Sequence, residues 1–112
     1  MTAPATVATQ PRDLCVEPYE DVRGCVRETV EAAGMAWALP IWECIITHES
    51  GWDRWAIGGA GERGLTQIHP VHFGWVDEDR LWEPDYNLQI AITLWRASGW
   101  KPWTTRYKCG LG

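Results

Sequence analysis

The sequence lacks the patterns that would place it in two large functional classes. No apolar stretch approaches the roughly 18–20 residues that a membrane-spanning helix needs, so we expect no membrane insertion. No run of lysine or arginine is present, and the net charge is −5, with 10 basic and 15 acidic residues, which argues against nucleic acid as a partner. Since internal repeats and low-complexity tracts are also missing, we interpret the 112 residues as one globular domain.

The start of the chain lacks the usual features of a secretory signal peptide. The segment MTAPATVATQPRD has neither a basic n-region nor an apolar h-region. Residues 1–12 are rich in Thr, Ala and Pro without an apolar period, so we expect an extended N-terminal arm before a domain that spans residues 13–112. If the protein works outside the cytoplasm, another route delivers it, or it is one part of a larger assembly.

The cysteines and histidines do not form a metal-binding pattern. No C-x-x-C pair occurs and the three histidines lack metal-ligand spacing, so we expect no metal and no cofactor. An even number of cysteines in a small domain permits two disulfides, with three possible connectivities. Free buried thiols are the alternative, which the missing signal peptide favours. The four cysteines are Cys15, Cys25, Cys44 and Cys109.

Three segments have apolar residues at helical spacing, each with a proline near its start and a glycine after its end. The first is expected to have Pro18 in its first turn and to stop at Gly34. We also expect one helical turn after Pro70 and a short last helix within residues 101–110. The three main helices are expected over residues 18–33, 40–50 and 84–98.

The segment between the second and third helices is rich in glycine. IGGAGERG holds four glycines in eight residues, which indicates a loop that could hide a short hairpin, although its strand signals are weak. The predicted fold is therefore mainly α: a single small helical domain with a glycine-rich loop or short hairpin beside the second helix.

Glu49 ends the second helix in the stretch CIITHESGW. Steps of three and four residues place it on the apolar face with Trp42, Ile45 and Ile46. Burial of an ionised carboxylate is costly, so its pKa is expected to rise. A carboxyl that keeps its proton near neutral pH can protonate a leaving oxygen, as a glycosidase general acid does. The alternative is a helix-end residue whose stem packs and whose head reaches water.

The stretch HESGWDRWAIGGAGERGLTQIHP resembles the motif of the lysozyme-like superfamily, most closely the lytic transglycosylase (SLT-type) domain. In that family a catalytic Glu followed by Ser ends a helix, and Gly-Ala-x-Gly-Leu-x-Gln-Ile-x-Pro follows a loop. Two additional residues before Gly64 are interpreted as a loop insertion. The likeness covers roughly residues 25 to 110 and includes Asn87 in the third helix. The matching motif residues are Glu49, Ser50, Ala56, Gly59, Ala60, Gly64, Leu65, Gln67, Ile68 and Pro70.

The resemblance implies cleavage of peptidoglycan glycan strands between N-acetylmuramic acid and N-acetylglucosamine. Glu49 would act alone, first as an acid and then as a base, and the sugar's own 6-hydroxyl would close an anhydro ring. Gln67 would offer its amide to the sugar, and Tyr107 would hold the acid or the acetamido group. The alternatives are a loop-fixing hydrogen bond for Gln67 and packing for Tyr107. Sugar stacking is expected from one or two of the tryptophans nearest the motif, Trp52, Trp55, Trp75 and Trp103.

A second resemblance concerns the cysteines. WECIITHES matches the spacing of tryptophan, cysteine and acid in the catalytic helix of animal-type lysozymes, where the cysteine pairs with one near the C-terminus. The resemblance implies Cys44–Cys109 and leaves Cys15–Cys25 as the second pair. The first pair would close a loop of about 65 residues and stabilise the fold by roughly 4 kcal/mol in the chain-entropy model.

A hydrolase of this class often needs a second carboxylate, and none has a clear claim here. His69 stands where goose-type lysozymes have an Asp. Asp53 and Glu62 are candidates for the second acid, whereas the acidic residues 77–79 are more typical of a solvated turn. A lysozyme-type muramidase and a non-catalytic cell-wall-binding or structural phage module are therefore the alternatives. Because no signal peptide is found, we expect a bacteriophage tail or lysis enzyme that acts at the bacterial cell wall, with glycan strands and other virion proteins as partners.

Overall fold

Three α-helices and four short 3-10 helices make up the computed structural model, which describes residues 13–112. The predicted N-terminal arm, residues 1–12, lies outside the described residues. The α-helices are α2 (Val22–Ala32), α3 (Leu39–Ser50) and α4 (Pro84–Ser98). The 3-10 helices are η1 (Ala36–Ala38), η2 (Pro70–His72), η3 (Glu78–Arg80) and η4 (Thr104–Cys109). The mainly helical fold that the sequence predicts is confirmed.

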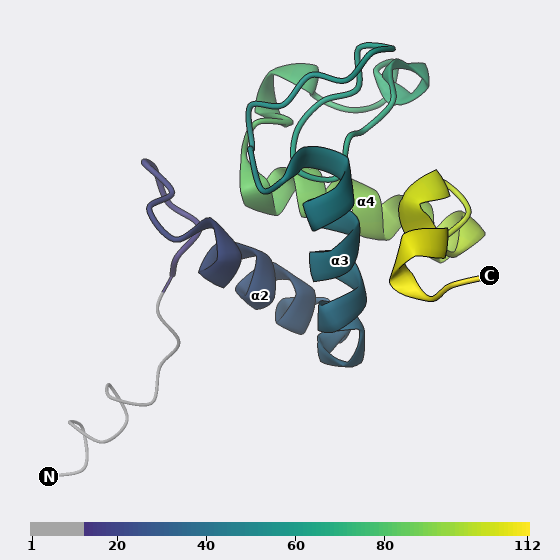
Figure 1. Cartoon of the computed structure of the whole chain (residues 1–112). Helices are drawn as coiled ribbons and strands as arrows, with labels where there is room; N and C mark the ends of the chain where they lie inside the picture. The colour runs from purple at the N-terminus through teal and green to yellow at the C-terminus, as the bar shows by residue number, and fades with distance from the viewer. Residues whose placement is uncertain (1–12) are drawn as a thin grey trace, which may run out of the picture.

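Helix α3 stands at the centre of the domain (Figure 1). Helix α2 packs against α4, and η4 packs along α3, so the last segment of the chain lies beside the middle one. The long connection between α3 and α4 gathers around the C-terminal end of α3. No described helix is long and apolar enough to span a membrane.

The prolines and glycines set the boundaries of α3 and α4 as expected. Pro40 lies in the first turn of α3, and Gly51 ends it in the left-handed region with φ 62° while its N–H donates to Ile46 O and Thr47 O. Pro84 begins α4, and Gly99 follows its end. The carboxyl of Glu49 is thereby fixed in the last turn of α3.

The predicted start of the first helix is wrong. Helix α2 begins at Val22 because the Asp21 side chain accepts a hydrogen bond from Gly24 N at 2.8 Å and caps it. Pro18 lies in a preceding turn, which the hydrogen bond from Tyr19 N to Val16 O closes. A proline is compatible with a first helical turn, but the capping carboxylate decides where this helix starts.

The core is built from the predicted apolar faces. Trp42, Ile45 and Ile46 of α3 are fully buried and meet buried side chains of α2 and α4. The Trp42 ring also lies 4.7 Å from the Trp100 ring and 5.3 Å from the Trp103 ring, centroid to centroid, so the last segment closes the core with aromatic contacts. The buried residues that α2 and α4 add to this cluster are Val26, Val30, Leu88, Ile90, Ala91 and Ile92.

Buried Asn87 of α4 holds the glycine-rich loop in place. Its Nδ2 donates to Arg63 O and Leu81 O, both at 3.1 Å, and its Oδ1 accepts from Thr66 N at 3.0 Å and from the Thr66 hydroxyl. Gly64 has φ +79°, and a Cβ there would collide with the Asn87 amide. In the described residues the loop has isolated antiparallel bridges, from Arg63 to Ile57 and to Ile68, in place of a full hairpin.

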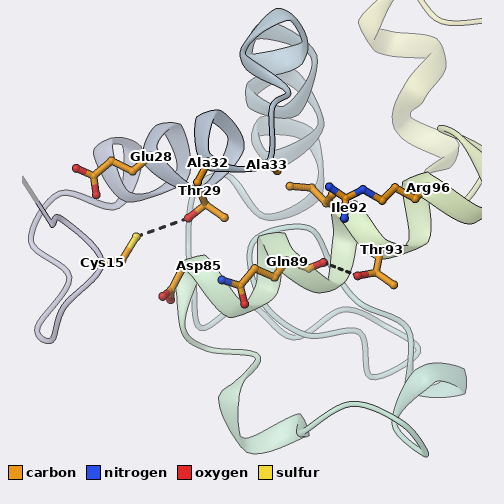
Figure 2. A pocket seen from close by; sticks show the side chains of 10 residues that line it. All are labelled: Cys15, Glu28, Thr29, Ala32, Ala33, Asp85, Gln89, Ile92, Thr93 and Arg96. Carbon is orange, nitrogen blue, oxygen red and sulfur yellow. Dashed lines mark hydrogen bonds between the residues drawn. The ribbon is translucent and has the colours of Figure 1, made fainter. Parts of the chain in front are cut away.

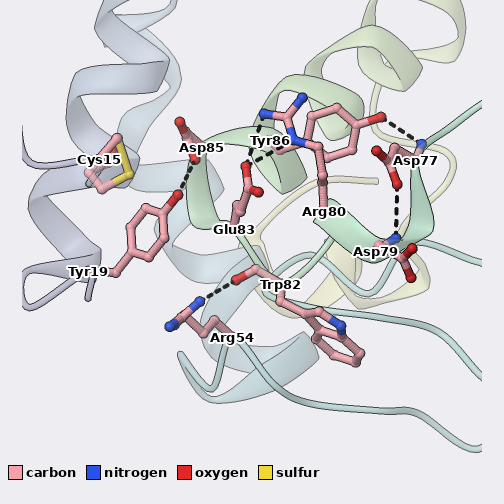
Figure 3. A network of polar contacts seen from close by, with 11 residues as sticks. Cys15, Tyr19, Arg54, Asp77, Asp79, Arg80, Trp82, Glu83, Asp85 and Tyr86 are labelled. Carbon is pink, nitrogen blue, oxygen red and sulfur yellow. Dashed lines mark hydrogen bonds and ion pairs between the residues drawn. A yellow bond between two sulfur atoms is a disulfide. The ribbon is translucent and has the colours of Figure 1, made fainter. Parts of the chain in front are cut away.

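A polar network joins the rest of this connection to α4 and to the segment just before it (Figure 3). Arg54 Nη1 donates to Trp82 O at 3.0 Å, and Tyr86 Oη accepts from Asp77 N at 2.8 Å. The segments before and after the glycine-rich loop are therefore both fixed by hydrogen bonds, which supports a defined conformation of the loop between them.

Two disulfides complete the domain, Cys15–Cys25 and Cys44–Cys109, and both pairings are those that the resemblance to animal-type lysozymes implies. The first ties the segment before α2 to that helix. The second joins α3 to η4, with 65 residues between the two cysteines in sequence. It holds η4 beside the helix that carries Glu49.

Candidate active site

Glu49 lies half-buried at the end of α3, between the core and the loop. Its Oε2 accepts a hydrogen bond of 2.8 Å from the Thr105 hydroxyl of η4. Within residues 13–112 this is the one hydrogen bond that its carboxyl makes, so Oε1 has no protein partner there. Oε2 is thus held in place by Thr105, while Oε1 remains available to bind another group.

Burial is the main reason why the pKa of Glu49 is raised. The hydrogen bond from Thr105 opposes this, because it favours the charged carboxylate, and the negative charge of Glu62 adds to the rise. The positive charges of His48 and Lys108 lower the pKa by smaller amounts. The net direction is upward, so Glu49 keeps its proton to a higher pH than an ordinary glutamate does.

Glu62 has the opposite behaviour. Its pKa is lowered, mainly by hydrogen bonds from its own backbone N–H and from Ala60 N, which donates to Oε1 at 2.9 Å. The two pKa values are therefore shifted in opposite directions from 4.5, and the negative charge of Glu62 contributes to the rise at Glu49. A pair of carboxyls whose pKa values are pushed apart is typical of acid–base sites.

The other candidate acids have local structural contacts. Asp53 is exposed in the turn after α3, where its Oδ1 accepts from Trp55 N at 2.9 Å. Asp77 caps η3 through a hydrogen bond from Asp79 N, in agreement with a solvated acidic turn. His69 is exposed, and its Nδ1 accepts from Val71 N at 3.0 Å. Of these groups, Glu62 is the carboxylate that acts on Glu49 electrostatically.

Gln67 fixes the loop from within. Its backbone lies in the left-handed region with φ 58°, and its Nε2 donates to Ala56 O at 3.2 Å and to Gly64 O at 3.0 Å. The loop-fixing role is therefore present, and the group left to meet a substrate is the amide oxygen. A Cβ on Gly58 would collide with Gln67 Oε1 and Glu62 Oε1, so both oxygens abut this glycine.

The contacts of the Trp52 and Tyr107 side chains are made with residues other than Glu49. The Arg23 guanidinium of α2 lies 4.0 Å from the Trp52 ring centroid, and Trp52 Nε1 donates to Thr47 Oγ1 at 3.0 Å. Tyr107 is 63% exposed on η4, and its hydroxyl accepts from Arg106 Nη2 at 2.8 Å. In the described residues, neither side chain forms a hydrogen bond to Glu49, so their substrate roles stay predictions.

Thr105 is the site residue that the sequence reasoning missed. It comes two residues before Tyr107, in a segment where the motif is weakly matched. The available signal was the Cys44–Cys109 pairing. Cys44 lies five residues before Glu49 in α3 and Cys109 lies in η4, so the pairing places η4 against α3 near the acid.

The tryptophans near the motif separate into exposed and buried rings. Trp55 and Trp75 are more than half exposed. The Arg54 guanidinium lies 4.2 Å from the Trp55 ring centroid, and the His72 ring lies 5.5 Å from the Trp75 ring, so sugar stacking on either tryptophan stays a prediction. Trp103 is buried, and its Nε1 donates to Thr66 O at 3.0 Å. The expectation that Trp103 could stack on sugars is wrong, because its ring is part of the core.

A family model described as the transglycosylase SLT domain matches residues 29–98, which include Glu49, Gln67 and Asn87. The match covers more than half of the chain. The protein therefore belongs to the SLT transglycosylase family, whose family-level function is peptidoglycan cleavage. A search of curated proteins finds no match to the chain, and a search of solved structures finds none either.

Proposed function

We propose that the protein is a lytic transglycosylase that cleaves the bond between N-acetylmuramic acid and N-acetylglucosamine, with Glu49 as the sole acid and base. The observation that carries the proposal is a half-buried carboxyl with a raised pKa, held by Thr105 on one oxygen and free of protein partners on the other in the described residues. Family membership supplies the substrate class.

In the first step, Glu49 gives its proton to the glycosidic oxygen. The bond from the muramic C1 to that oxygen breaks, and the electron pair leaves with N-acetylglucosamine, which departs as an alcohol. Positive charge develops at C1, and Glu49 is now a carboxylate whose charge the Thr105 hydroxyl stabilises.

In the second step, the Glu49 carboxylate takes the proton from the muramic 6-hydroxyl while that oxygen bonds to C1. The product is a 1,6-anhydro ring, no water is consumed, and Glu49 is protonated again. The nucleophile belongs to the substrate, so its effective concentration at C1 is high.

One observation favours a second candidate, a muramidase that uses water. The pKa of Glu62 is lowered and its charge contributes to the raised pKa of Glu49, and a second carboxylate can activate a water molecule. This enzyme would leave a reducing end in place of the anhydro ring.

Mass spectrometry of muropeptides after digestion of purified peptidoglycan tests the proposal. The wild type is expected to release anhydro products, and Glu49→Gln to release none. Glu43→Gln is the matched control, since it makes the same change on the same helix at a group without a site contact, and it should keep activity. Reducing ends would instead assign the muramidase, and no cleavage by the wild type would favour a cell-wall-binding module. A phage origin remains a prediction from sequence.

A further inference from the structure

A cavity of about 460 Å³ opens between α2 and α4, and Glu49 and Gln67 do not line it (Figure 2). Its volume is within the range of small-molecule pockets, about 300–1,000 Å³. Apolar wall comes from Ala32, Ala33 and Ile92, and one side is formed by the disulfide-bonded Cys15. A cavity with an apolar wall and a few polar groups is suited to a small organic ligand.

The polar groups follow one face of α4. Asp85, Gln89, Thr93 and Arg96 line the cavity and are spaced by three or four residues, so they form a stripe along the helix. The Cα atoms of Asp85 and Arg96 are about 16 Å apart along the helix axis at the α-helical rise. The Arg96 side chain extends back over Ile92 toward the cavity (Figure 2).

The charges are arranged with the acids at one end and the arginine at the other. Glu28 of α2 and Asp85 are half-buried on the side of Cys15. Glu28 Oε1 accepts from Leu14 N at 2.8 Å, and Asp85 Oδ1 accepts from Tyr19 Oη at 3.4 Å, so neutral donors hold both carboxylates in position. Within residues 13–112 none of Glu28, Asp85 and Arg96 forms an ion pair.

The helix dipole gives a simpler reason for these signs, since an acid near the start of α4 and a base near its end are both favourable. That reason does not account for Glu28, which comes from a different helix, or for the open volume between the charges. A ligand that carries an ammonium group and a carboxylate some atoms apart would pair with both ends at once.

We propose that this cavity binds a short zwitterionic peptide, with its ammonium group beside Glu28 and Asp85 and its carboxylate at Arg96. The peptide class rests on the proposed function: the stem peptide of an uncross-linked glycan strand carries free carboxylates and, where it contains a diamino acid, a free amine. The Gln89 amide offers a donor and an acceptor to the peptide backbone between the two charged ends. The Thr93 hydroxyl donates to Gln89 O at 2.9 Å, so its oxygen is left as an acceptor for a peptide N–H. The cavity would thus select strands by their peptides, away from the bond that is cut.

Isothermal titration with a synthetic tetrapeptide stem, L-alanyl-γ-D-glutamyl-meso-diaminopimelyl-D-alanine, tests the binding. Glu49→Gln protein is used throughout, so binding is independent of cleavage. Arg96→Met and Asp85→Asn are each expected to raise the Kd at least ten-fold, while Arg27→Met, at an exposed arginine of α2, should leave it unchanged. A peptide with acetylated amines and amidated carboxylates should not bind. Absence of binding to the free peptide, equal binding of the blocked one, or an unchanged Kd in folded Arg96→Met protein would overturn the proposal.

A second measurement separates this proposal from the proposed function. Cleavage by the protein with Glu49 intact is measured on strands that carry stem peptides and on strands stripped of them. Arg96→Met should raise KM several-fold for the first substrate alone, with kcat kept. Peptide binding without any cleavage would contradict the proposed function and leave the cavity assignment standing. Cleavage with the same KM for both strands would overturn the assignment to strand-attached peptides, even if the free peptide binds.

Discussion

Removal of the Cys44–Cys109 disulfide is predicted to destabilise the domain more than removal of Cys15–Cys25. The two bonds join residues 65 and 10 apart in sequence. In the chain-entropy model they restrict the unfolded chain by amounts worth about 4.3 and about 2.7 kcal/mol at 25 °C. Replacing both cysteines of a pair by alanine should lower the free energy of unfolding by about 4 kcal/mol in the first case and about 3 kcal/mol in the second. Guanidinium denaturation followed by tryptophan fluorescence measures both.

The same comparison also tests the site. The Cys44–Cys109 bond holds η4, which carries Thr105, against the helix of Glu49, whereas Cys15–Cys25 joins the segment before α2 to that helix. Peptidoglycan cleavage by the folded Cys44→Ala/Cys109→Ala protein should therefore fall, and cleavage by the Cys15→Ala/Cys25→Ala protein should persist. The reasoning is refuted if the two pairs cost equal stability, or if loss of Cys44–Cys109 leaves activity intact.

Three further predictions concern Glu49 and Asn87. Thr105→Val removes a hydrogen bond that favours the Glu49 carboxylate, so its pKa should rise further and the high-pH limb of the activity profile should move to higher pH; an unmoved limb would contradict this. Since the pKa of Glu49 is raised in the folded state, its ionisation costs stability as pH rises above the ordinary glutamate value of 4.5. Glu49→Gln should then melt at a higher temperature than the wild type at pH 8 and at a similar one at pH 3; a lower melting temperature at pH 8 would count against a buried acid. Asn87→Ala leaves buried backbone groups unpaired and should cost about 3 kcal/mol in denaturant titrations, whereas a loss below about 1 kcal/mol would show that the loop does not depend on it.

The helices were predictable because their signals are local. Pro40 and Gly51 bound α3 as the sequence indicates, and the helix buries Trp42 and Ile45 and half-buries Glu49, as their three- and four-residue spacing predicts. The start of α2 was missed because two residues near it, Pro18 and Asp21, both suit a helix start, and the hydrogen bond that decides between them is visible in the structure alone.

Much of the site was not predictable, because it depends on contacts between distant segments. Thr105 meets Glu49 across 56 residues of sequence. The Asn87 side chain accepts a hydrogen bond from Thr66, which lies 21 residues earlier in the sequence. No local pattern indicates that this one amide would have four hydrogen-bond partners. Gln67 was identified by its motif position, yet its amide hydrogens are used by the loop itself, because its own left-handed backbone turns them toward Ala56 and Gly64.

The central claim is that the pKa of Glu49 is raised while the pKa of Glu62 is lowered, so that Glu49 keeps its proton to a higher pH than Glu62 does. Nuclear magnetic resonance titration of the side-chain carboxyl carbons, with Glu49→Gln to assign the resonance, measures this in the free protein. The account predicts that Glu49 titrates above the ordinary glutamate value of 4.5 and that Glu62 titrates below it. A Glu49 carboxyl that titrates at or below 4.5 would contradict the account.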